Sequence, residues 1–142
     1  MTPDEIATRL EEIAAAEDFA RRSAELVAIW ERQGVGVEAV SPILRFMEAH
    51  PALDFGTPGA LVHFVERFYG RGYEGMVVEL VLRRPTAHTA WMLNRLVNGA
   101  KKQDERDRLI SVLRLASAHP MADPDTTASI GHFLEGLGSP SD

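Results

Sequence analysis

Apolar residues recur along this chain at steps of three and four, the spacing that places them on one face of an α-helix. The first such segment opens with Thr2 as a helix N-cap and Pro3 at the first helical position, after which Ile6 and Leu10 share a stripe. Seven further segments repeat the pattern, and proline or glycine punctuates them. The predicted helices cover about residues 2–14, 17–33, 37–50, 58–68, 73–84, 86–98, 104–118 and 123–137. A restart at Ser41-Pro42 is the alternative within residues 37–50, and Thr57-Pro58 is a second cap-plus-proline start.

The segment at residues 73–84 allows two interpretations. Its centre is rich in β-branched residues and is compatible with a short buried strand. Tyr73, Val77, Leu80 and Val81 also form a helical stripe, and both neighbouring segments are helical in pattern. We therefore predict a helix, with a buried strand as the alternative.

The connections between these segments are short, so consecutive helices are expected to lie antiparallel. Leu61–Glu66 resembles Ile130–Glu135 in the order of its residues, a degenerate echo of the kind that stacked helix pairs produce. The predicted fold is all-α, with about eight short antiparallel helices in either a HEAT/armadillo-like α-solenoid or an irregular helical bundle. We expect one helical domain over residues 1–138 and a frayed tail over residues 139–142.

The amino-acid composition excludes some classes of function. The 142 residues include no cysteine, which excludes disulfides and thiolate chemistry and fits a reducing cytosol. With 21 acidic and 15 basic side chains the net charge is −6, so a nucleic-acid partner is not expected. A basic protein partner fits this charge, and so does a simple contribution to solubility. The acidic start lacks signal-peptide features and no apolar run is long enough for a bilayer, which predicts a cytoplasmic protein without a membrane partner.

Catalytic motifs are absent from the sequence. His63 and Glu66 stand at i,i+3, a spacing used in carboxylate di-metal bundles, and His132 and Glu135 repeat it. An enzyme that holds a metal with these four residues is one hypothesis, but hydrogen bonding between histidine and glutamate on a helix surface explains the spacing equally simply. We predict no catalytic residue, no metal and no cofactor, and therefore a protein that is not an enzyme.

The predicted helix at residues 86–98 has two distinct faces. Opposite its apolar stripe it places a tryptophan amid polar side chains, and Arg95 stands one turn beyond Trp91, where it can stack on the ring. Tryptophan, tyrosine and arginine dominate binding hot spots. The loop at residues 68–73 adds two tyrosines and an arginine. The candidate partner-binding residues are Tyr69, Arg71, Tyr73, His88, Trp91, Asn94, Arg95 and Asn98. The alternative is a central helix covered on both sides, whose asparagines satisfy loop backbones.

Two stretches, Leu53–Glu66 and Arg84–Leu96, together resemble a family of small helical, HEAT-like bacterial immunity proteins. The resemblance covers about residues 51–99, roughly a third of the chain. Such proteins neutralise polymorphic or contact-dependent-inhibition toxins. The resemblance implies a cytosolic inhibitor that binds a cognate toxin domain, for instance a basic nuclease, and occludes its active site or a site nearby. The alternative is a HEAT-type adaptor or scaffold that binds another cytosolic protein.

Overall fold

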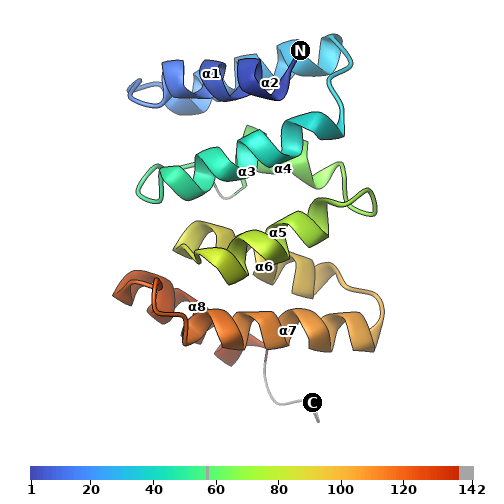
Figure 1. Cartoon of the computed structure of the whole chain (residues 1–142), viewed down its shortest axis with the longest axis vertical. Coiled ribbons are helices and arrows are strands. Elements are labelled where there is room, and N and C mark those ends of the chain that lie inside the picture. The colour runs from blue at the N-terminus through green and yellow to red at the C-terminus, as the bar shows by residue number, and fades with distance from the viewer. Residues whose placement is uncertain (57, 138–142) are drawn as a thin grey trace. The chain divides into compact units, whose positions relative to one another are not determined.

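A computed structural model describes residues 1–56 and 58–137 of the chain (Figure 1). Over these residues the structure consists of eight α-helices and one 3-10 helix, with no strand. The elements are α1 (Pro3–Ile13), α2 (Phe19–Arg32), η1 (Val37–Ala39), α3 (Val40–Ala49), α4 (Ala60–Glu66), α5 (Tyr73–Arg83), α6 (Ala87–Gly99), α7 (Gln103–Ser117) and α8 (Pro124–Gly136). The predicted all-α fold is confirmed, and residues 73–83 are helix rather than strand.

Side-chain caps start several helices where the sequence predicted them. In α1 the Glu5 N–H donates to Thr2 Oγ1 at 3.2 Å while the Thr2 N–H donates to Glu5 Oε1 at 3.4 Å. Thr86 and Thr89 exchange the equivalent pair at the start of α6, at 3.1 and 3.2 Å. Each reciprocal pair satisfies backbone donors that a helix start leaves without an intrahelical partner.

One segment divides near its alternative start, and one helix begins later than predicted. The segment at residues 37–50 is divided into η1 and α3 beside the alternative start at Ser41-Pro42, because Pro42 cannot donate to Glu38 and is tolerated only in the first turn of a regular helix. Helix α4 starts at Ala60 with Gly59 as its N-cap, later than the predicted Thr57-Pro58 start; Thr57 lies outside the described residues. Glycine is required at position 59, since a Cβ there would lie 1.8 Å from the Phe55 carbonyl oxygen.

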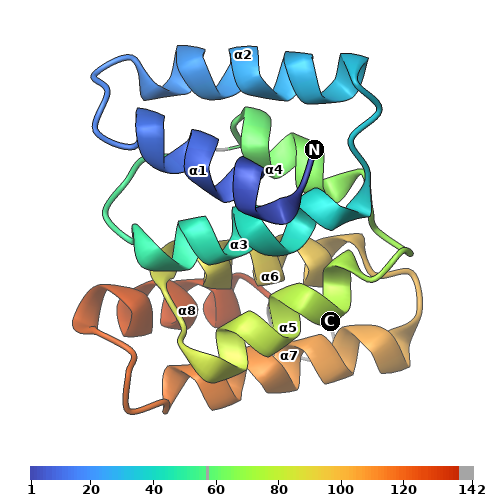
Figure 2. The same ribbon diagram turned by 45° about the horizontal axis from the view of Figure 1, so that its top comes forward.

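The chain forms two compact units, residues 1–73 (unit 1) and residues 74–142 (unit 2). One helical domain over residues 1–138 stays a prediction. The boundary falls at the first residue of α5. The predicted tail at residues 139–142 lies outside the described residues. In unit 1, α1 packs against α3 and α2 against α4, so that two consecutive helical hairpins stack (Figure 2).

Unit 1 is held together by an aromatic core. Phe46 lies 6.1 Å from Phe19 and 6.0 Å from Phe55 between ring centroids. Phe64 lies 6.0 Å from Trp30 and thereby joins α4 to α2. Such pairs add stabilisation beyond the apolar area that they bury. The buried aromatic side chains of unit 1 are Phe19, Trp30, Phe46, Phe55, Phe64, Phe68 and Tyr73.

Unit 2 has an aliphatic core. Helix α6 packs against both α7 and α8, and α7 packs against α8. The side chains with no exposed surface at these contacts are Met92, Leu93, Val97, Leu109, Leu113 and Ile130. Residues 74–142 contain two aromatic side chains, Trp91 and Phe133, and both are only partly buried. The fully buried side chains of helices α6, α7 and α8 therefore include no aromatic residue.

Candidate protein-binding site

Helix α6 has a buried apolar face and an opposite face that carries polar and aromatic residues. Ala90, Leu93, Leu96 and Val97 are buried, as the predicted stripe requires. The predicted binding residues of this helix lie on the other side, where Asn98 is exposed and the rest are partly exposed: His88, Trp91, Asn94, Arg95 and Asn98. Thr86 and Thr89 fix the start of α6 and thereby the direction in which this face points.

Trp91 forms a stack with its helical neighbours. The Arg95 guanidinium carbon lies 5.1 Å from the centroid of the Trp91 ring, so the predicted cation–π contact is confirmed. The His88 ring lies 5.4 Å from the Trp91 ring with 34° between the planes. These contacts hold the indole in one orientation while leaving part of it accessible. A tryptophan ordered in this way loses little conformational entropy when a partner covers it.

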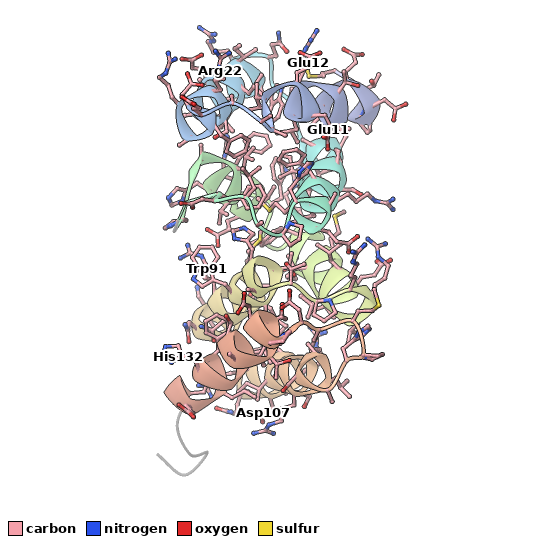
Figure 3. The ribbon with its side chains drawn as sticks, turned by 90° about the vertical axis from the view of Figure 1, so that its left-hand side faces the viewer. Glu11, Glu12, Arg22, Trp91, Asp107 and His132 are labelled. Atoms are coloured by element: carbon pink, nitrogen blue, oxygen red, sulfur yellow. The ribbon has the colours of Figure 1, made fainter. Side chains whose placement is uncertain are left out.

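A hollow adjoins the Trp91 stack between α6 and α8. Its volume is about 180 Å³. The residues that line it are Asn94, Asn98, His132, Phe133, Gly136 and Leu137. Trp91 and His132 project from α6 and α8 on the same side of unit 2 (Figure 3). We define the α6–α8 surface as His88, Trp91, Asn94, Arg95, Asn98, His132 and Phe133.

Asn94 brings an unsatisfied acceptor to this surface. Its Oδ1 is buried and accepts no hydrogen bond from the described residues. A buried polar atom without a partner costs about 1–3 kcal/mol, and such atoms in a folded protein call for an explanation. Asn94 also lines the hollow, so its side chain adjoins the space that a partner residue could enter.

The candidate residues of the loop before α5 do not form one site. The Tyr69 side chain is exposed (46%), and the Arg71 guanidinium carbon lies 5.6 Å from the Phe68 ring. Tyr73 is fully buried (0%), so its proposed role as an accessible contact was wrong. The helical spacing explains this, since Tyr73 continues the buried stripe of Val77 and Val81.

The His–Glu pairs considered as metal ligands belong to different units. His63 is exposed on α4 in unit 1, and His132 is exposed on α8 in unit 2. In the part of the chain that the structure describes, no three histidine, aspartate or glutamate side chains gather closely enough to hold a metal ion. In the same residues, no helix combines the length and the apolar character needed to cross a membrane.

Local hydrogen bonds shift the pKa of one carboxylate at the start of α8. The side chain and the backbone N–H of Thr126 both donate to Asp123 and lower the pKa of its carboxyl below the ordinary 3.8. Asp123 therefore stays ionised, and its negative charge interacts favourably with the positive end of α8. This cap fixes the helix that carries His132 and Phe133.

Comparisons of the chain with protein-family models, with curated proteins and with solved structures gave no match.

Proposed function

We propose that this chain is a binding protein whose α6–α8 surface docks on a partner protein, and that the partner is a bacterial toxin domain that the chain neutralises. The main support for docking is the difference in aromatic burial between the two units. Unit 1 buries seven of its eight aromatic side chains, whereas both aromatic residues of positions 74–142 lie partly exposed on one surface. An ordered aromatic residue surrounded by polar groups is typical of a binding hot spot.

The chemistry of the α6–α8 surface suits a protein rather than a small metabolite. The hollow is about 180 Å³, below the range of about 300–1,000 Å³ typical of small-molecule sites. It is large enough to receive one protruding side chain. A partner residue inserted there would pack against Asn94 and the Phe133 ring, while Trp91 and Arg95 would form the neighbouring contact.

The resemblance of Leu53–Glu66 and Arg84–Leu96 to immunity proteins supports a toxin as the partner. The second of these stretches includes most of the α6 part of the α6–α8 surface. The net charge of −6 would draw a basic toxin, such as a nuclease, toward the chain and speed their association.

Co-expression in bacteria tests this proposal. A toxin domain encoded by a reading frame next to this one would be expressed with the wild-type chain, with Trp91→Ala or with Leu115→Ala. Leu115 is the matched control, because it is a large exposed apolar residue (62%) on α7, outside the α6–α8 surface. We expect the wild type and Leu115→Ala to restore growth and Trp91→Ala to fail, with unchanged circular dichroism spectra and melting temperatures within a few degrees of the wild type.

Failure of the wild-type chain to protect against any toxin encoded beside it would exclude the toxin as partner. A HEAT-type adaptor is the second candidate, favoured by the stacked hairpins of unit 1. It predicts that the wild-type chain retains a protein from its own cytosol and that Trp91→Ala does not. Equal retention by the wild type and by Trp91→Ala would exclude docking through the α6–α8 surface altogether.

A further inference from the structure

Unit 1 contains a groove that the sequence analysis did not predict. It runs between α1, η1 and α3 and has a volume of about 480 Å³. Its lining residues are Pro3, Asp4, Ala7, Glu11, Glu38, Ser41, Pro42, Arg45, Phe46 and Ala49. Half of them are apolar, three carry carboxylates and one carries a positive charge.

Two of the three carboxylates are held in place by hydrogen bonds from their own unit. The Gly36 N–H donates to Glu38 Oε1 at 2.9 Å, and this bond keeps the pKa of Glu38 below the ordinary 4.5. His50 Nε2–H donates to Glu11 Oε1 at 2.8 Å and connects α3 to α1. Each carboxylate can accept further hydrogen bonds, because an ionised carboxylate has about four acceptor positions. The groove therefore presents oriented acceptors beside an apolar surface.

Glu11 and Glu12 are neighbours in α1, but their side chains point to different sides of the helix (Figure 3). Glu11 lines the groove, whereas Glu12 points away from α3 and pairs with Arg9 at 2.9 Å (Figure 3). Asp4 joins Glu11 on the groove side because the two are separated by seven residues, or about two helical turns. The negative charge of the groove is thus a property of one face of α1, with Glu12 as a natural control beside it.

We propose that this groove binds an extended, arginine-containing segment of a partner protein. Asp4, Glu11 and Glu38 would receive the guanidinium groups, whose planar donors match carboxylate oxygens. The aliphatic stems of the arginines would lie along the apolar lining at Pro42 and Phe46. Arg45 is the residue in the groove that opposes such a ligand. The groove belongs to unit 1, so this inference does not depend on the function proposed for the α6–α8 surface.

Selection from a library of random heptapeptides on the purified full chain tests the proposal. We expect the selected peptides to be enriched in arginine, and one of them would be synthesised with a fluorescent label for anisotropy titrations. The triple variant Asp4→Asn, Glu11→Gln, Glu38→Gln removes the charges and keeps the side-chain shapes. It should bind the peptide about tenfold more weakly, and salt should weaken binding to the wild type.

Arg45→Glu provides a test that misfolding cannot imitate, because this variant should bind the peptide about threefold more tightly than the wild type. Glu12→Gln and Trp91→Ala should both bind like the wild type. The same peptide with citrulline in place of arginine should lose most of its affinity, because citrulline keeps the shape and removes the charge.

Several results would overturn the proposal. These are selection without enrichment in arginine, undiminished binding by the triple variant, or weaker binding by Arg45→Glu. Spermine competing for the groove as effectively as the peptide would also overturn it, because the groove would then be a general cation site rather than a peptide site. Loss of peptide binding in Trp91→Ala would place the peptide at the α6–α8 surface instead.

Discussion

The two units of this chain use aromatic residues in opposite ways. In unit 1, rings from α2, α3, α4 and the loop before α4 meet in the interior, and Trp30 and Phe64 are almost completely buried. In unit 2, aliphatic residues fill the interior and Trp91 and Phe133 remain partly exposed. The same residue type thus stabilises one unit and is available for recognition in the other.

The units also differ in charge. Residues 1–73 carry twelve acidic and seven basic side chains, whereas residues 74–142 carry nine acidic and eight basic ones. Most of the negative charge therefore belongs to the unit that buries all of its aromatic residues except Tyr69. Unit 1 offers a basic partner electrostatic attraction, which mainly affects association rates, and unit 2 offers an aromatic anchor, which mainly affects dissociation.

Replacement of one large aromatic residue by alanine in each unit tests the difference in aromatic burial. It should give the largest change in the free energy of unfolding. Phe64→Ala should lower the free energy of unfolding by about 3–5 kcal/mol, because the ring is buried against Trp30 and Phe68. Trp91→Ala should lower it by less than about 1 kcal/mol, because the stack lies at the surface. Urea unfolding followed by circular dichroism measures both. Equal losses would mean that Trp91 belongs to the core and would remove the contrast.

Removal of the N-terminal cap of α6 should change the free energy of unfolding by an intermediate amount. Thr86→Ala eliminates the reciprocal bonds with Thr89 and should lower the free energy of unfolding by about 1–2 kcal/mol. It should also weaken partner binding, because His88 stands in the first turn that this cap orders. Thr127→Ala, an exposed threonine within α8, serves as the control and should change stability by less than about 0.5 kcal/mol. A cap variant with normal stability would show that packing alone fixes the start of α6.

Lowering the pH should give the smallest change in the free energy of unfolding. The carboxylates that cause this change have different hydrogen-bond partners in the two units. In unit 1, hydrogen bonds from Arg22 and Arg21 lower the pKa of Asp18; in unit 2, hydrogen bonds from Thr126 lower that of Asp123. Both folded pKa values lie below the ordinary 3.8, so each carboxylate stabilises the fold at neutral pH. That stabilisation should disappear as the pH falls through 3.8 toward the folded values.

Unfolding free energies between pH 6 and pH 3 measure this loss, and Asp18→Asn and Asp123→Asn should each flatten the pH dependence. Added salt should reduce the contribution of Asp18 more than that of Asp123, because its partners are exposed ions. An unchanged pH profile in either variant would contradict the assigned partner.

Local sequence signals predicted most of the fold. Thr2-Pro3, Thr86 and Asp123-Pro124 mark helix starts that depend on bonds within one turn, and the structure contains them. The Thr57-Pro58 start was wrong because Gly59, which makes close contact with the Phe55 carbonyl, sets the beginning of α4 instead. That contact depends on the path of the loop, which helical periodicity does not encode.

The candidate site was predictable only in part. The Trp91–Arg95 contact follows from one-turn spacing within α6. The roles of His132 and Phe133 were missed, because they depend on the packing of α8 against α6. The groove of unit 1 was missed for the same reason, since Glu38 joins Asp4 and Glu11 only after α1 packs against α3. The seven-residue interval between Asp4 and Glu11 was the one signal in the sequence.

Hydrogen–deuterium exchange on the complex with the proposed toxin partner tests docking through the α6–α8 surface, because it maps the protected residues without any substitution. We expect slower exchange in residues 87–99 and 124–136, the helices α6 and α8, than in the free chain. Unchanged exchange in both helices, with protection confined to other segments, would contradict docking through the α6–α8 surface.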